Sequence, residues 1–319
     1  MAKNRFDKFA DGTATDIIPS DFGSLTSFPI SASGGSSVIN PFGGLKNLET
    51  VEFSGNLTAI GHTPLAITTF VILFGNPLLT ADNPTNLSEI RINEGTVSLQ
   101  YGAFQAIPSV KTFYLPSTLR YIPTGETYPN ESTVMTNSTF YSDIKIFQCN
   151  NTDYKTTFVI DNNNPYFYTH GNDIVTKDTY ELIEGGSLTS IPNDIKIIGY
   201  ASMKFANGIT ALVIPSGVEL IKKGAFYGVS SLTSVTIPAS VTEIKPLAFC
   251  SCSNLATIRF EHSASDSITL YTGTSGSFYG GKNARAVSIY TDNDYIKSLD
   301  WSSQNITPTF YHLDGTAWA

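Results

Sequence analysis

The stretch ITALVIPSGVELIKKGAFYGVSSLTSVTIPASVTEIKPLAFCSCSNLATIRF, residues 209–260, decides the fold because it repeats itself. Its apolar triplet recurs twice at a displacement of 23 residues: Ile209, Leu212 and Ile214, then Leu232, Val235 and Ile237, then Leu255, Ile258 and Phe260. Other positions move in step, among them Pro215 with Pro238 and Phe226 with Phe249. A fixed period of this length is the mark of a repeat architecture. We therefore predict a β-rich repeat solenoid.

The same period extends outward from this stretch. Toward the start it meets Ile191, Ile195 and Ile198, with Met203 in the slot that Phe226 fills. Earlier turns carry the same triplets, at Leu25, Phe28 and Ile30, at Leu48, Val51 and Phe53, at Leu87, Ile90 and Ile92, and at Val110, Phe113 and Leu115. Weaker turns centre on Phe70 and Ile72, Ile144 and Ile146, and Val287 and Ile289. Together these positions predict about eleven turns of a 23-residue unit.

The spacing within one turn predicts its structure. The second and third apolar residues are two apart, which is the period of a β-strand, so both side chains point inward. A proline such as Pro215 or Pro238 follows directly and ends the strand, because it has no backbone N–H for a sheet. The Gly-Ala-Phe segment then turns the chain back and places an aromatic ring in the core. One turn cannot bury its own apolar face, so we expect the stability to come from stacked neighbours.

Composition excludes several classes of function. With 41% hydrophobic residues the chain has enough apolar surface for a large core, and its net charge of −8 leaves no basic excess for nucleic acid. No run of about 18 apolar residues exists, so we expect no membrane insertion. The first residues carry no apolar segment after the basic ones, so we expect no signal peptide in this sequence.

Residues that could carry chemistry form no recognisable site. The four histidines lie far apart without metal-ligand spacing, and we expect them in loops or on the surface: His62, His170, His262 and His312. Cys252 is predicted as a small buried hydrophobe and Cys250 as half exposed. Asp292 and Asp294 lack the further oxygen ligands of a calcium loop. No catalytic triad or phosphate-loop pattern is present, and we predict no enzyme, no metal and no cofactor.

The segment IPSGVELIKKGAFYGVSSLTSVTIPASVTEIKPLAFCSCSNLATIRF resembles the BspA-like leucine-rich repeats of bacterial surface proteins. The resemblance implies a leucine-rich-repeat solenoid over residues 21–310, with short tails at 1–20 and 311–319. Residues 161–183 are similar to an insert of the family that we interpret as a β-hairpin leaving the solenoid. Residues 289–308 are similar to its terminal cap. The family is associated with adhesion and with host or matrix binding, without a shared site.

The strands predict one exposed surface. In each triplet the residue between the two inward positions must face outward, which gives a ladder that runs across the strands. Its members are Pro29, Glu52, Val71, Arg91, Tyr114, Lys145, Ser190, Val213, Thr236, Arg259 and Ser288. We predict that this ladder binds a ligand through Arg91, Tyr114, Lys145 and Arg259, since Tyr and Arg dominate binding hot spots. A rival contact patch is the hairpin segment, with Tyr166, Phe167 and Tyr168.

Two hypotheses for function follow. The first is a non-enzymatic binding or adhesion module, on a bacterial surface or secreted, that contacts a protein or a glycan. The second is a structural subunit of a larger assembly such as a phage particle or cell-envelope complex, which would place the chain in a virion or an intracellular assembly. The lack of a signal peptide in the sequence favours this alternative.

Overall fold

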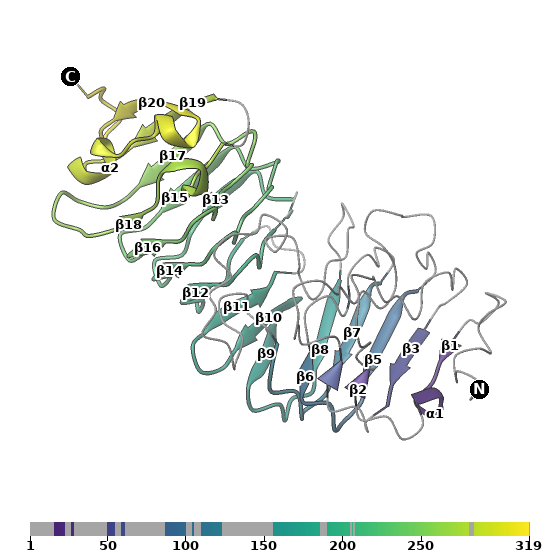
Figure 1. Cartoon of the computed structure of the whole chain (residues 1–319). Helices are drawn as coiled ribbons and strands as arrows, with labels where there is room; N and C mark the ends of the chain where they lie inside the picture. The colour runs from purple at the N-terminus through teal and green to yellow at the C-terminus, as the bar shows by residue number, and fades with distance from the viewer. Residues whose placement is uncertain are drawn as a thin grey trace. The chain divides into compact units, whose positions relative to one another are not determined.

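The structure is a computed structural model of residues 1–319 that forms two compact units, Met1–Asn172 and Asp173–Ala319. It describes residues 16–22, 27–28, 50–54, 59–60, 87–99, 104, 110–122, 156–185, 190–204, 206, 208–280 and 284–318. Most elements are short β-strands in parallel sheets (Figure 1). This confirms the repeat solenoid predicted from the 23-residue period.

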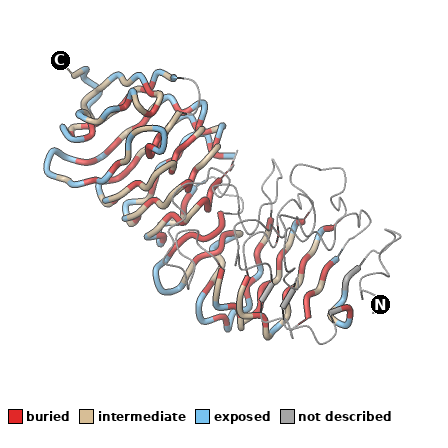
Figure 2. The backbone as a smooth tube through the Cα atoms, in the orientation of Figure 1, coloured by how far each residue is buried: buried red, intermediate tan, exposed pale blue. Residues whose placement is uncertain are grey.

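The larger sheet of the first unit is parallel and follows the apolar triplets. Its strands lie in the order β1 (Asp16–Ile17), β3 (Thr50–Phe53), β5 (Glu89–Ile92), β7 (Thr112–Leu115) and β8 (Thr157–Ile160). Buried and more exposed residues alternate along β3, β5, β7 and β8, as expected for one inward face (Figure 2). The sheet begins at Asp16, ahead of the boundary at residue 21 that the sequence suggested.

Five further elements are described in the first unit. A smaller parallel sheet joins β2 (Ser27–Phe28), β4 (Ala59–Ile60) and β6 (Ser98–Leu99). The short helix α1 spans Pro19–Phe22, and Asp21 accepts a hydrogen bond from the backbone N–H of Ile18 at 3.0 Å. The last strand of this unit is β9 (Phe167–His170).

The second unit contains a parallel sheet that carries the triplets quoted above. Its strands lie side by side in the order β13 (Ala211–Val213), β15 (Ser234–Ile237), β17 (Thr257–Phe260), β19 (Arg285–Tyr290) and β20 (Ile306–Tyr311) (Figure 1). Register places Leu212 beside Val235 and Val235 beside Ile258, so residues one period apart are neighbours in space. Pro215 and Pro238 come just after their strands, as predicted.

A second sheet of this unit includes the short strands that follow Pro192, Pro215 and Pro238. It contains β18 (Thr269–Leu270), β16 (Glu243–Ile244), β14 (Leu220–Ile221), β12 (Ile197–Ile198), β11 (Glu181–Glu184) and β10 (Asp173–Thr176). β10 and β11 pair antiparallel, and they fall in the segment 161–183 expected to form a hairpin, which β11 exceeds by one residue. Because β11 also pairs parallel with β12, β11 itself belongs to the solenoid sheet.

The aromatic residues of the turns form the core. In the second unit the ring of Phe249 stacks on Phe226 at 4.8 Å and on Phe278 at 4.9 Å, and all three side chains are fully buried. Met203 is also fully buried, in the slot predicted for it. In the first unit Phe104 lies between Phe53 and Phe113 at centroid distances of 5.9 and 5.2 Å. These contacts confirm that the repeat aromatics point inward.

A small cap follows β19 in the second unit. It contains the helix α2 (Asp294–Ser298) and the 3-10 helix η5 (Ser302–Gln304), and it leads into β20. Trp301 is buried, with its ring 5.8 Å from that of Phe278, and its indole Nε1 donates to the carbonyl of Ile296 at 2.9 Å. The cap therefore extends the aromatic core beyond the last repeat.

Candidate functional site

The larger sheet of the first unit presents an outward row that we call the Arg91 face: Glu52, Arg91, Tyr114 and Val159. Parallel pairing puts Glu52 beside Arg91, Arg91 beside Tyr114, and Tyr114 beside Val159. The three residues predicted to be outward here, Glu52, Arg91 and Tyr114, are thus neighbours in space.

The prediction for the next position of this face was wrong. The sequence assigned it to Lys145, which lies outside the described residues, but the structure pairs Tyr114 with Val159. Thr112 and Thr157, which are also paired, are 45 residues apart, close to two periods. The 23-residue period predicts the next strand one period after β7, so it could not predict that β8 follows only after 45 residues. A half-exposed valine, 42% accessible, therefore replaces the expected lysine.

Arg91 is held in place by two neighbours. Its guanidinium carbon lies 3.7 Å from the centroid of the Tyr114 ring, a cation–π contact. Its Nε also pairs with Glu89 Oε1 at 2.6 Å, and Glu89 precedes it by two positions on the same strand. Because planar Arg on an aromatic ring is already ordered, less side-chain entropy is lost when a partner binds.

The second unit presents two adjacent outward rows, which we call together the Arg259 face. The first row is Ala211, Ser234, Thr257, Ser288 and Thr309. The second row is Val213, Thr236, Arg259, Tyr290 and Tyr311. Strand alternation places both rows on the side of the sheet away from the buried residues.

The sequence predicted Ser288 beside Arg259, and this register was wrong. Ser288 pairs with Thr257, and Tyr290 takes the place beside Arg259. The shift is two residues, so each side chain stays on its predicted side of the sheet. Apolar alternation fixes that side but not the position along the strand, which explains the error.

Arg259 is tied to the C-terminal segment. Its two terminal nitrogens, Nη1 and Nη2, both donate to the carbonyl of Leu313, each at 3.0 Å. Beside it the rings of Tyr290 and Tyr311 stack at 4.9 Å. The guanidinium thus orders the turn that follows β20 and keeps its remaining N–H groups for other acceptors.

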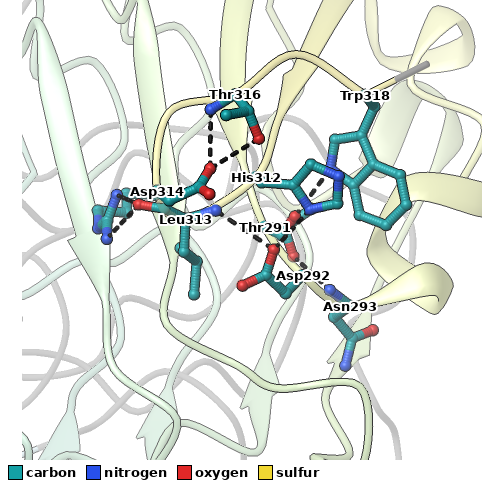
Figure 3. A network of polar contacts seen from close by, with 9 residues as sticks. Thr291, Asp292, Asn293, His312, Leu313, Asp314, Thr316 and Trp318 are labelled. Carbon is teal, nitrogen blue, oxygen red and sulfur yellow. Dashed lines mark hydrogen bonds and ion pairs between the residues drawn. The ribbon is translucent and has the colours of Figure 1, made fainter.

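Beyond this face the end of the chain forms a polar network, shown in Figure 3. His312 Nδ1 lies 2.9 Å from Asp292 Oδ1, and the His312 ring stacks on Trp318 at 4.0 Å. Lys297 places its ammonium 3.9 Å from the centre of the Trp318 ring. The indole Nε1 of Trp318 donates to the carbonyl of Thr291 at 3.0 Å. These contacts fold the terminal segment back onto the second unit.

The aromatic residues of the predicted hairpin patch have different environments. Phe167 is buried, 5% accessible, so it is a core residue and the prediction that it offers a contact was wrong. Tyr166 is exposed, and its hydroxyl accepts a hydrogen bond from Arg120 Nε at 2.9 Å. Tyr168 is half-buried. A period-two pattern with one inward aromatic explains why neighbouring rings separate in this way.

Two expectations about buried polar residues need correction. His262 is fully buried and its Nε2 lies 2.8 Å from the carbonyl of Val241, although a surface position was expected. Cys250 is buried and not half exposed. Cys252 is buried as predicted, and removal of its thiol from water raises the pKa of Cys252 to about 12. Both thiols are free and therefore act as packing groups.

Asp292 precedes the helix α2, and Asp294 is the first residue of that helix. Asp292 accepts hydrogen bonds from His312 and from the backbone N–H of Leu313. Within the described ranges no three His, Cys, Asp or Glu residues gather as a metal site would require. The same part of the chain contains no helix that is both long and apolar enough to span a bilayer.

Sequence reasoning missed the C-terminal network and the pairing of Arg259 with Leu313. Both depend on residues outside the repeat, where no period relates one position to another. The one indication of this network in the sequence is the cluster of ring-bearing residues Tyr311, His312 and Trp318.

Comparison with known proteins assigns the family. A model described as the BspA type leucine rich repeat region matches residues 82–170 and 184–307, in six copies. These residues are well over half of the chain, which therefore belongs to the BspA-type leucine-rich-repeat family. This confirms the resemblance found in residues 214–260.

Several solved structures are similar in fold. A leucine-rich repeat protein from Eubacterium ventriosum has 16% identity and a TM-score of 0.45, over 86% of this chain and 70% of its own. The pneumococcal vaccine antigen PcpA has 13% identity and a TM-score of 0.44, over 86% and 69%. A leucine rich cell surface protein from Faecalibacterium prausnitzii has 15% identity and a TM-score of 0.47, over 94% and 88%. No curated protein matches the sequence.

Proposed function

We propose that this chain is a non-enzymatic binding module that contacts a protein partner through the Arg91 face. The observation that carries the proposal is the contact of Arg91 with Tyr114 at 3.7 Å, on the outward side of a regular sheet. Solenoids commonly use such continuous faces for recognition. Membership of the BspA-type family supports a binding role.

The chemistry of the Arg91 face favours a protein partner. Tyr and Arg are the side chains most enriched in hot spots, and apolar area around them excludes water when the partner binds. Val159 supplies such area, since it is 42% exposed and lies beside Tyr114. Glu52 and Glu89 flank this centre and offer acceptors at the rim, where polar groups give register and specificity.

We also propose that the module acts at a bacterial cell surface. The proposal rests on membership of the BspA-type family and on the resemblance of residues 214–260 to the repeats of bacterial surface proteins. Detection of the native protein on intact cells by antibody labelling, with loss of the signal after mild external protease treatment, would support this location. Signal in lysed cells alone would contradict it.

Binding is tested with the full chain and a panel of purified extracellular-matrix proteins. For the panel member that binds, we expect Arg91→Ala/Tyr114→Ala to raise Kd by about tenfold or more. The matched control is Arg120→Ala/Tyr166→Ala, which removes another Arg–Tyr pair of the same unit, with a centroid distance of 5.3 Å. Equal loss in both variants, or loss in the control alone, would overturn the assignment to the Arg91 face.

A further inference from the structure

The Arg259 face differs in chemistry from the Arg91 face. Four of the five residues in its first row carry a short side-chain hydroxyl: Ser234, Thr257, Ser288 and Thr309. Within the described part of the chain, none of these four hydroxyls takes part in a hydrogen bond. A hydroxyl both donates and accepts, so the row offers an unused donor and acceptor on each strand.

The spacing of this row is that of the sheet. The four residues are paired in register on β15, β17, β19 and β20, and neighbouring strands lie about 4.8 Å apart. An extended chain of β-1,4-linked hexopyranoses advances by a comparable distance with each sugar. Laid across the strands, such a chain brings one sugar to each hydroxyl, whereas an extended peptide advances by about 3.3 Å per residue and falls out of step.

Aromatic surface lies at one end of the same face. Tyr290 and Tyr311 lie two residues along their strands from Ser288 and Thr309, on the same side of the sheet, and their rings stack at 4.9 Å. Both tyrosines are partly exposed. Sugar rings present C–H groups that pack on aromatic surface, and the phenolic hydroxyl supplies a further hydrogen-bonding group.

The charge of this face indicates an uncharged polymer. Among its ten outward positions Arg259 is the one charged residue, and its guanidinium already donates twice to Leu313. The nearest carboxylates along β17 and β19, Glu261 and Asp292, follow the strand ends. The single positive charge of Arg259, with two carboxylates nearby, gives no positive electrostatic potential that would attract a polyanion.

The other sheet of the same unit has a different surface. Beside its strands Lys196 pairs with Glu219 at 3.8 Å and Lys245 with Glu243 at 2.8 Å. The hydroxyl-rich, nearly uncharged surface is thus a property of the sheet β13-β15-β17-β19-β20 and not of every sheet in the unit.

From the unused hydroxyl row, the adjacent tyrosine pair and the near absence of charge, we infer that the Arg259 face binds a neutral β-1,4-linked polysaccharide laid across its strands. The hydroxyl row bonds successive sugars, the tyrosines pack on a sugar ring at one end, and Arg259 donates its remaining N–H groups to sugar oxygens. This site is separate from the Arg91 face and takes a different class of ligand.

Calorimetry with the full chain tests the inference. The neutral probes are cellohexaose, β-1,4-mannohexaose and chitohexaose, and the charged probe is hexamannuronate, which has the same β-1,4 linkage. We expect at least one neutral hexamer to bind at least tenfold more tightly than hexamannuronate. Failure of all three neutral hexamers to bind would overturn the inference, as would equal or tighter binding of the acidic one.

Variants locate the site. We expect Ser234→Ala/Thr257→Ala/Ser288→Ala to weaken binding at least tenfold at an unchanged melting temperature. The control Ser216→Ala/Ser267→Ala/Thr269→Ala removes three exposed hydroxyls elsewhere in the unit and should leave the affinity unchanged. Equal loss in both triple variants would overturn the site. Arg91→Ala/Tyr114→Ala should keep its glycan affinity, which separates this test from that of the proposed protein partner.

Discussion

Phe249 shows at the scale of one residue how the repeat is stabilised. Its ring lies between Phe226 and Phe278, at 4.8 and 4.9 Å, with no exposed surface. Each ring packs against the rings of the turns before and after it, so a cavity at Phe249 would remove contacts from two neighbouring turns. The sequence predicted this role, because the position recurs with the same residue type one period apart.

The substitution Phe249→Ala should therefore lower the free energy of unfolding by roughly 3–5 kcal/mol, through lost burial and the cavity left behind. The control Val213→Ala alters a side chain that is 69% exposed and should change it by less than about 0.5 kcal/mol. Urea denaturation followed by tryptophan fluorescence measures both. Similar midpoints for the two variants would contradict the inward stack.

The thiol of Cys252 is fully buried in the core of the second unit. Burial raises the pKa of its thiol to about 12, so the reactive thiolate is scarce at pH 8. We expect iodoacetamide to leave Cys252 unmodified in the folded protein and to modify it readily in denaturant, as measured by peptide mass spectrometry. Equal rates of modification with and without denaturant would show that the thiol is accessible.

The strands and their pairing register could be predicted from the sequence only where successive turns keep the 23-residue period. Between residues 209 and 260 the strands and their register agree with the prediction, because successive turns have equal length. The predictions for Lys145 and Ser288 were wrong where the interval between strands exceeds one period. On β19 alternation still identified the outward side, since a shift by two residues preserves it.

The cap helix α2 depends on Asn293. Its side-chain Oδ1 accepts from the backbone N–H of Ile296 at 3.2 Å, which caps the helix, and its Nδ2 donates to the carbonyls of Ser263 and Asp266. Asn293→Ala should destabilise by about 1–2 kcal/mol through loss of the cap, and more where the partly buried carbonyls lose their donor.

Asn293→Asp is the matched variant, because a carboxylate caps equally well but cannot donate to Ser263 and Asp266. Comparing the thermal unfolding of both variants separates the two contributions. We expect the aspartate to retain part of the stability that the alanine loses. Unchanged melting temperatures in both would show that Asn293 does not hold the cap.

In a repeat fold the inward-facing residues determine stability, and different, outward-facing residues are available for recognition. Inward positions are restricted to apolar and aromatic residues, while the outward row on each strand is free to vary. The sequence identified Arg91, Tyr114 and Arg259 as outward residues, but not the Arg91–Tyr114 contact or the bond from Arg259 to Leu313. Those interactions depend on side-chain conformation and on segments outside the repeat.

We propose that the Arg91 face contacts the protein partner. Photo-cross-linking tests this contact, with benzoylphenylalanine placed at position 159, beside Tyr114, in the full chain bound to the matrix protein identified in the panel. The control position is Ile18, which is 43% exposed in the same unit. We predict a covalent complex from position 159 and none from position 18. A complex from position 18 without one from position 159 would contradict binding through the Arg91 face.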